Sequence, residues 1–319
     1  MGHGKLKKFA ENETFRCLLQ PDAASVLAKP DGSKELILRD HAIKGRWNAE
    51  MFAKDQPIVV ELGCGKGDYT IALARRHPEM NFIGVDIKGA RLWKGAKEAT
   101  EESMGNVAFL RTRIEFIDAF FGPDEVSEIW LTFSDPQLRG SENARLTSPL
   151  FLRRYSHFLK PGGIVHLKTD SRFLYEYTQS VIRANDLEVL ASGVDIYNDG
   201  VQAGYFPENR RCATPPTKWA PRRVSIRGPR KSADFWGGSA EGGTGSRANT
   251  LPELPDLPAV FEVQTFYETM FLKMGLPITY LAFRLGERKE FAYPTDFDAA
   301  YWREAEGPRR SFSHQPTKQ

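Results

Sequence analysis

The sequence has too few cysteines and histidines for a disulfide framework or a metal site. Its three cysteines, Cys17, Cys64 and Cys212, lie far apart and form no CxxC pair. The six histidines are equally scattered and make none of the spacings typical of metal ligands. A chain of 319 residues can bury a full-sized core without such crosslinks. We therefore expect a protein of a reducing compartment that folds without a metal ion.

Long apolar runs are also missing. No run approaches the roughly 20 residues that a membrane span needs, and residues 1–8 lack the apolar centre of a secretory signal. We therefore expect a cytoplasmic protein. The composition, with 41% hydrophobic and 27% charged residues, is that of a globular chain and excludes wholesale disorder. A net charge of +3 allows an anionic partner but does not require one.

Short apolar, β-branched runs alternate with helical stretches between residues 57 and 197. This alternation predicts an α/β fold with a mostly parallel, twisted sheet and helices on both faces. A helix at 261–274 and a strand at 278–285 follow, and we expect that last strand to be an antiparallel strand at the sheet edge. The earlier strands are expected at 58–62, 81–86, 107–110, 128–133 and 164–168, and the earlier helices at 69–76, 89–101, 151–159 and 174–184.

Residues 198–260 interrupt this pattern. They are rich in glycine and proline, and residues 201–250 contain nine Lys or Arg against three acids. Such a segment buries too little apolar surface to offset the entropy of ordering it, so we predict a flexible basic insertion. The insertion divides one catalytic domain, which we expect to span residues 46–290. A polar, basic extension at 1–45 and a polar tail at 291–319 are expected to flank that domain.

A glycine loop follows the strand expected at 58–62. Gly63, Gly65 and Gly67 allow the backbone to turn sharply and to approach a ligand closely, because glycine has no Cβ. A dinucleotide-binding loop would have a glycine at position 68, where this sequence has Asp68. An acid at the start of a helix also disfavours a pyrophosphate. The loop therefore makes NAD an improbable cofactor.

Two acids accompany the loop. Glu61, directly before it, suits a cationic ligand such as the methionyl ammonium of S-adenosylmethionine. Asp86 ends the next strand, where a carboxylate can accept both ribose hydroxyls of a nucleoside. NAD enzymes carry a similar acid, so Asp86 alone does not identify the cofactor. Together the loop and the acids predict an S-adenosylmethionine-dependent methyltransferase; the alternative is a plain strand-to-helix turn beside a solvated acid.

Two further acids are expected at neighbouring strand ends. Asp135 follows the strand at 128–133, and Asp170 follows the strand at 164–168. Pro136 restricts Asp135 to an extended conformation, which aims its carboxylate. Open α/β sheets bind ligands at such carboxyl ends. Two carboxylates there could accept hydrogen bonds from N1–H and the N2 amino group of guanine.

Four motifs occur here in an order that resembles the bacterial tRNA (guanine-N7)-methyltransferases. They are the glycine loop, Phe-Ser-Asp-Pro at 133–136, Lys-Thr-Asp at 168–170 and Thr-Phe-Tyr-Glu at 265–268. The resemblance covers about residues 1–197 and 261–290, and its last motif is far more specific than the glycine loop. It implies a class I, Rossmann-like methyltransferase. It also implies that S-adenosylmethionine methylates guanine N7 in the variable loop of tRNA, at position 46.

The resemblance also implies roles for individual residues. Asp135 would be the catalytic residue, although guanine N7 carries a lone pair and no proton, so its attack on the methyl group needs no general base. The donor would be held by Glu61, Gly63, Gly65, Gly67, Asp86 and Asp135. The guanine and the surrounding RNA would contact Arg139, Asp170, Thr265, Phe266, Tyr267 and Glu268.

RNA binding requires basic residues that neutralise the phosphate backbone. Alternatively, each candidate basic residue is an ordinary solvated charge on the surface and binds no RNA. We expect tRNA as the partner, no obligatory protein partner, and a monomer or a homodimer. The candidates are Lys5, Lys7, Lys8, Lys88, Arg91, Lys94 and the basic insertion.

Two other functions remain open from the sequence. A methyltransferase of the same fold that acts on a protein or a small molecule would explain the glycine loop. It would leave Asp135, Asp170 and the 265–268 motif without a common purpose. A catalytically silent RNA-binding scaffold is the other possibility, and the retention of Glu61 and Asp86 argues against it.

Overall fold

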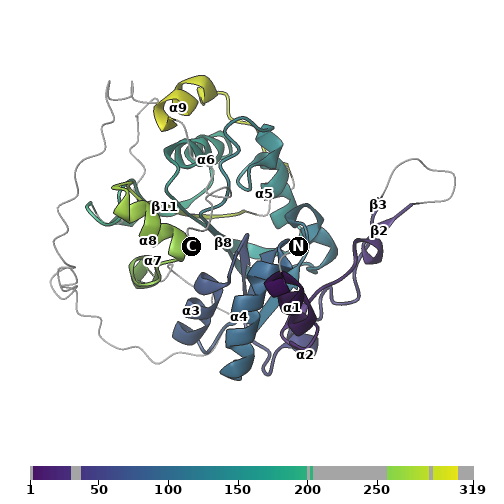
Figure 1. The fold of residues 1–319 in the computed structure, drawn as a ribbon. Helices are drawn as coiled ribbons and strands as arrows, with labels where there is room; N and C mark the ends of the chain where they lie inside the picture. Colours follow the sequence, from purple (N-terminus) through teal and green to yellow (C-terminus); the bar gives the residue numbers. More distant parts are fainter. Residues whose placement is uncertain (1–2, 30–36, 200–201, 204–256, 287–289, 308–319) are drawn as a thin grey trace, which may run out of the picture.

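A computed structural model describes residues 3–29, 37–199, 202–203, 257–286 and 290–307. Most of the predicted basic insertion and the last part of the predicted tail lie outside the described residues. Figure 1 shows the described chain as a sheet with helices packed around it.

The described residues form one nine-stranded sheet. Its strands are β1 (Leu18–Leu19), β4 (Ile58–Leu62), β5 (Asn81–Asp86), β6 (Val107–Arg111), β7 (Val126–Thr132), β8 (Leu159–Thr169), β9 (Val189–Gly193), β10 (Gln202–Ala203) and β11 (Thr279–Arg284). Their order across the sheet is β1-β6-β5-β4-β7-β8-β11-β9-β10. Six of these strands, β1, β6, β5, β4, β7 and β8, are parallel, which confirms the predicted mostly parallel sheet. The order reverses direction at β4, and open α/β sheets bind their ligands at such a switch point.

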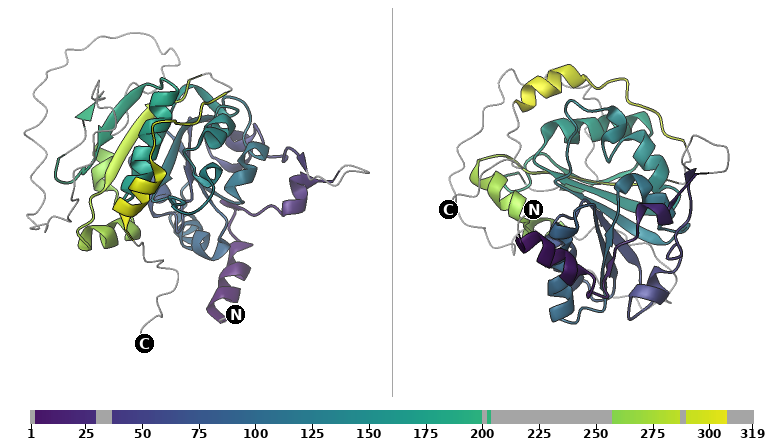
Figure 2. Two further views of the ribbon diagram at one scale, coloured as in Figure 1. Left: turned by 90° about the horizontal axis from the view of Figure 1, so that it is seen from above. Right: turned by 45° about the vertical axis from the view of Figure 1, so that its right-hand side comes forward.

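Helices cover both faces of this sheet, as predicted (Figures 1 and 2). One face packs on α3 (Asp68–Arg76), α4 (Gly89–Glu101), α7 (Leu257–Glu262) and α8 (Phe266–Lys273). The other face packs on α2 (Trp47–Met51), α5 (Pro149–Tyr155) and α6 (Arg172–Ala184). Every residue of β4, β5 and β7 is buried, as expected for strands that are covered on both sides. Three short 3-10 helices complete the connections: Ala23–Ser25, Ile114–Ala119 and Glu142–Ala144.

The strand predicted at 278–285 is β11, and its antiparallel direction is confirmed. The prediction that it forms the edge of the sheet is wrong, because β11 lies between β8 and β9 and is antiparallel to both. β10 follows β9 on the outer side. The sequence Val-Leu-Ala-Ser-Gly of β9 is short and ends in two weak strand formers. For that reason no strand was expected beyond β11.

The first and last described helices pack on the central domain. Near the N-terminus, β1 adds to β6, and α1 (His3–Asn12) lies on α4, where the Asn12 side-chain amide donates to the Gly89 carbonyl at 2.9 Å. Near the C-terminus, α9 (Ala299–Glu306) lies on α6, and its Glu306 carboxylate accepts the Phe173 N–H at 3.0 Å. The hairpin of β2 (Leu27–Ala28) and β3 (Ile37–Leu38) projects from the body (Figure 2). The division at residues 45 and 290 stays a prediction.

None of the described helices combines the length and the apolar character needed to cross a membrane.

Candidate active site

The loop between β4 and α3 has the conformation that its glycines predict. Gly63, Gly65 and Gly67 have φ angles of 82°, 60° and 78°, in the left-handed region that favours glycine. The N–H groups of Gly63 and Cys64 donate to the Val85 carbonyl at 2.8 and 3.0 Å, which ties the loop to the end of β5. A Cβ on Gly63 or Gly65 would meet no atom within 4 Å. No side chain or backbone atom of the described residues therefore crowds these two positions of the loop.

Below the loop, three glycines make room for one phenylalanine. A Cβ on Gly67 or Gly95 would lie 2.6 Å from the Phe109 ring, and a Cβ on Gly84 would lie 2.8 Å from it. Real Cβ contacts are never this close, so these positions let α3, α4 and β5 close around the ring. Gly67 was predicted from the glycine-loop pattern, whereas Gly84 and Gly95 were not.

Asp86 connects the glycine loop to β5. Its Oδ2 accepts the Gly65 N–H at 3.0 Å, and its Oδ1 accepts the Lys88 N–H at 2.7 Å. The residue is 8% exposed. Each carboxylate oxygen has two acceptor positions, so both can still accept a hydroxyl. The predicted contact of Asp86 with a ribose is compatible with this geometry and stays a prediction.

Glu61 lies deeper than Asp86. It is 4% exposed, and its two oxygens accept the hydroxyls of Thr70 and Thr132, each at 2.5 Å. Burial raises the pKa of the Glu61 carboxyl, and the two hydroxyl bonds oppose that rise. The carboxylate thus joins β4 to α3 and β7 directly below the glycine loop. Its predicted contact with an ammonium group stays a prediction.

The chain that follows β7 forms a strained loop, called here the acceptor loop (residues 133–140). Phe133 and Gln137 both have a φ of 51°, and each such residue costs on the order of 1 kcal/mol. Two contacts hold this backbone in place. The Phe133 N–H donates to the Lys168 carbonyl at 2.8 Å, and Arg303 of α9 donates to a loop carbonyl at 2.7 Å.

Asp135 is exposed within the acceptor loop. Its Oδ1 accepts the Gln137 N–H at 2.9 Å, while the neighbouring Pro136 is buried. Arg139 is exposed on the same loop. Asp170 is half-buried and follows directly after β8. Because β7 and β8 are parallel neighbours, Asp135 and Asp170 lie at adjacent strand ends, as the sequence predicted.

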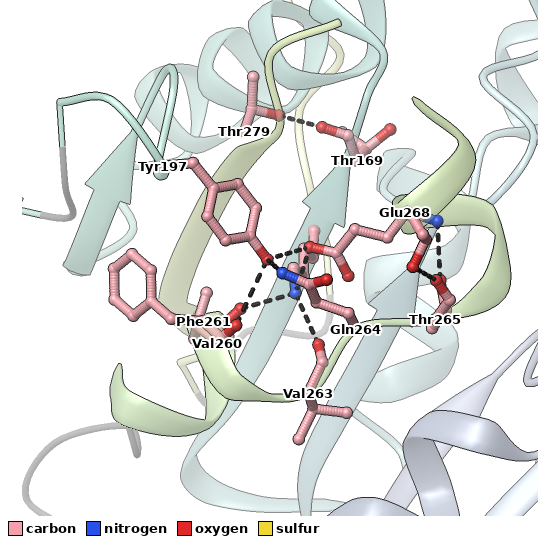
Figure 3. A network of polar contacts seen from close by, with 11 residues as sticks. Thr169, Tyr197, Val260, Phe261, Val263, Gln264, Thr265, Glu268 and Thr279 are labelled. Carbon is pink, nitrogen blue, oxygen red and sulfur yellow. Dashed lines mark hydrogen bonds and ion pairs between the residues drawn. The ribbon is translucent and has the colours of Figure 1, made fainter. Parts of the chain in front are cut away.

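A buried ion pair fixes α8 to the end of β8 (Figure 3). Lys168 Nζ lies 2.7 Å from Glu268 Oε1, and both side chains are fully buried. The ammonium also donates to the carbonyls of Val260 and Val263 at 2.6 and 3.0 Å. The Tyr197 hydroxyl donates to the same Glu268 oxygen at 2.6 Å. Burial lowers the pKa of Lys168 and raises that of Glu268, and the attraction between the two charges opposes both shifts.

The Thr-Phe-Tyr-Glu motif is the beginning of α8. Thr265 is the N-cap, and its hydroxyl accepts the Glu268 N–H at 3.1 Å. A Thr-x-x-Glu pattern is the sequence signature of a capping box, so this helix start carries a local signal of its own. Glu268 reaches Lys168 in the core, whereas Phe266 is exposed and Tyr267 is half-buried. The predicted substrate contacts of these four residues stay predictions, and Phe266 is the most accessible of the four.

A second buried polar group lies beside the ion pair, on the same face of the sheet. The His166 ring lies between Glu128 and Tyr280, with Nε2 3.0 Å from the carboxylate and Nδ1 2.8 Å from the hydroxyl. Trp130 stacks on the imidazole, with ring centroids 3.9 Å apart and planes within 3°. This group joins β7, β8 and β11 and explains how a polar histidine is accommodated in the core. Among the described residues, no three His, Cys, Asp or Glu side chains are arranged to hold a metal ion.

Basic residues from two parts of the sequence meet on α1 and α4. Lys7 and Lys88 are exposed, and Lys8 and Arg91 are half-buried; in the described part of the chain, none of these four lies within 4 Å of a carboxylate. Lys94 pairs with Asp68 at 2.5 Å. The Lys5 side chain lies outside the described residues.

The comparisons with known proteins agree with this geometry. A family model described as "Putative methyltransferase" matches residues 55–202. A protein of Christiangramia forsetii named tRNA (guanine-N(7)-)-methyltransferase is 39% identical over 282 residues, which is 88% of this chain and 97% of that protein. The chain belongs to the tRNA (guanine-N7)-methyltransferase family. The resemblance seen in the sequence motifs is therefore confirmed.

A second family member, from Bacteroides thetaiotaomicron, is 50% identical over 198 residues, which cover 62% of this chain and 74% of that protein. Among solved structures, the antibiotic-resistance methyltransferase Kmr matches with 18% identity and a TM-score of 0.36, over 46% of this chain and 82% of that chain.

Proposed function

We propose that this protein transfers the methyl group of S-adenosylmethionine to N7 of a guanine in tRNA, at position 46 of the variable loop. One observation carries the proposal. In a chain of this family, the glycine loop with Asp86 and the acceptor loop with Asp135 lie at the same edge of the sheet, on either side of the switch point. We expect the enzyme to work in the cytoplasm, as a monomer or a homodimer.

The donor site would be formed by the glycine loop and its two acids. The open space in front of Gly63 and Gly65 leaves room for the ligand to approach the backbone. Asp86 would accept the ribose hydroxyls with the lone pairs that its two amide bonds leave free. Glu61 would contribute negative potential for the methionyl ammonium. When bound, S-adenosylmethionine supplies an electrophilic methyl group.

The acceptor site would be formed by Asp135 and Asp170. Because guanine N7 has a lone pair and no proton, the protein needs to position the base and does not need to remove a proton. The two carboxylates would accept N1–H and the N2 amino group and thereby orient the ring. Their negative charge would also stabilise the positive charge that develops on the purine during transfer.

The basic residues on α1 and α4 support an RNA substrate. Lys7, Lys8, Lys88 and Arg91 have no carboxylate partner among the described residues, so their charges are available to phosphates. The surface lies next to the donor site, because Lys88 directly precedes α4 and its N–H is bound to Asp86. An RNA backbone on this surface would lie close to the methyl donor.

The test is methyl transfer by the purified full chain to bulk tRNA, with donor binding measured separately by calorimetry. We expect N7-methylguanine at position 46 and its loss from the tRNA of cells that lack the protein. Donor binding without transfer to any RNA would support a silent scaffold. Transfer to protein extracts alone would support a methyltransferase with a protein substrate.

A further inference from the structure

Phe266 is the most exposed large hydrophobic side chain in the described part of the chain, at 58%. It is the first residue of α8 and follows the N-cap. A single exposed apolar residue is ordinary on a protein surface. The position of Phe266, however, sets it apart from the others.

The Phe266 ring contacts the glycine loop through a cation. The Lys66 ammonium lies 4.7 Å from the ring centroid, and Lys66 itself is exposed in the middle of that loop. The Tyr267 ring meets the Phe266 ring edge-on, with centroids 5.8 Å apart, and so restricts its orientation. An aromatic face and an ammonium group are thus held side by side at the edge of the donor site.

The same helix also contacts the acceptor loop. The ring of Phe271 lies 5.8 Å from the ring of Phe133, where that loop begins. Between these two contacts, Glu268 is fixed by its buried pair with Lys168 (Figure 3). Helix α8 therefore contacts both the glycine loop and the acceptor loop, and Phe266 is its first residue.

We infer that Phe266 is a stacking platform for an unpaired base of the bound tRNA and that Lys66 contacts the phosphate of that nucleotide. This inference rests on the proposed function; it specifies how Phe266 of the implied substrate segment contacts the RNA and adds Lys66 as a second contact. Splayed RNA bases stack on aromatic side chains whatever their identity, and a neighbouring cation neutralises the backbone. The cation–π contact is exchanged for base stacking and a phosphate contact when the RNA binds.

The surroundings of Phe266 favour a nucleotide over an apolar protein partner. Its neighbours Gln264 and Thr269 are exposed and polar, and Lys66 brings a positive charge. Apolar docking sites are contiguous patches, whereas these described neighbours of Phe266 are polar. Trp93 is half-buried and has two cations at its ring, Lys8 at 4.4 Å and Lys97 at 5.2 Å, whereas Phe266 is exposed and has Lys66 alone among the cation–π contacts of the described residues.

The first experiment substitutes the ring. Phe266→Ala should raise the KM for tRNA about tenfold, the loss expected for one base–aromatic stack. Phe266→Trp should restore the KM to within about twofold of the wild type, whereas Phe266→Leu should not, because leucine has no aromatic face. Donor affinity by calorimetry and the melting temperature should stay unchanged in all three variants. Met274→Ala, which truncates an exposed side chain at the other end of α8, is the matched control and should match the wild type.

The second experiment removes the charge. Lys66→Ala should reduce the slope of log binding constant against log salt by about 1, and Lys66→Arg should preserve the slope. The matched control is Lys54→Ala, which removes an exposed lysine before the opposite end of β4 and should leave the slope unchanged.

The two proposals fail in different ways. If the wild type methylates tRNA and Phe266→Ala has the same KM, or if leucine restores KM as well as tryptophan does, the stacking platform is excluded and the proposed function stands. If the wild type methylates no tRNA, the proposed function itself has failed. A parallel loss of donor affinity in Phe266→Ala would show that the ring serves the cofactor and would also overturn the inference.

Discussion

The two halves of the site hold their carboxylates in opposite ways. On the donor side, Glu61 and Asp86 are buried, and each of their oxygens already accepts a hydrogen bond from the protein. On the acceptor side, Asp135 is exposed on a loop with two left-handed residues. A folded RNA can only use groups that it reaches from outside, and Asp135 is such a group. The donor acids therefore have a structural role whatever they bind, whereas Asp135 is held by a single backbone N–H of its own loop.

The largest effect is expected on the free energy of unfolding, from the buried ion pair of Lys168 and Glu268. Lys168→Met should lower the free energy of unfolding by about 3–5 kcal/mol, because the Glu268 carboxylate is then left buried without its counter-ion. Denaturant unfolding measures the loss. The double variant Lys168→Met with Glu268→Leu is the control and should be less destabilised than the single variant, since it contains no unpaired buried charge. A double variant that is as unstable as the sum of both single variants would contradict this account.

The second-largest effect is expected on kcat, from a substitution on the acceptor loop. Asp135→Asn should lower kcat for tRNA about 100-fold, because the variant loses a negative charge near the purine in the transition state. The resemblance implies that Asp135 also contacts the donor, but the residue is exposed on the acceptor loop. Its donor affinity, measured by calorimetry, should therefore stay within about twofold of the wild type. An equal loss of donor affinity would show that the residue serves the cofactor and would remove the contrast between the two halves.

A third variant tests the donor side. Asp86→Asn should weaken donor binding about tenfold, because charge-assisted bonds to hydroxyls are lost and the amide group faces a backbone N–H. At saturating donor, kcat should change by less than about threefold. A large fall in kcat together with unchanged donor affinity would assign Asp86 to the chemistry instead.

The smallest effect is expected on how the free energy of unfolding depends on pH. Burial raises the pKa of Glu61 in the folded protein above its value of about 4.5 in the unfolded chain. The folded state therefore binds this proton more tightly, and the stability contributed by the residue is lost as pH rises from 4.5 through the folded pKa. Glu61→Gln cannot titrate. The free energy of unfolding of the wild type, relative to this variant, should fall across that pH range in urea titrations, and a constant difference would refute the shift.

The sequence predicted the elements whose signals are local. The strands at 58–62 and 81–86 and the helix at 89–101 have the predicted bounds, since a buried strand and an amphipathic helix each carry their own pattern. The place of β11 was mispredicted because an inner position is defined by a partner strand, β9, with a weak pattern of its own. The position of a strand within a sheet depends on which strands pair with it, so it cannot be predicted well from the sequence of that strand alone.

In the candidate site too, local features were predictable from the sequence and contacts between distant segments were not. The positive φ angles of the glycine loop followed from residue types alone. The pairing of Lys168 with Glu268 did not, because the two residues are distant in sequence and each was interpreted only as part of a substrate-binding motif. The Phe109 ring beneath Gly84 and Gly95 was likewise not predictable, since a missing Cβ has meaning only once the facing side chain is known.

The inner position of β11 has a consequence for how the enzyme is made. A nascent chain that has not yet reached residue 257 already contains the glycine loop, Asp86 and the acceptor loop, but between β8 and β9 it lacks the strand that joins them. The segment that fills this gap also delivers α8 and the counter-ion of Lys168. A chain that ends before residue 257 therefore lacks both the strand that joins β8 to β9 and the counter-ion of Lys168.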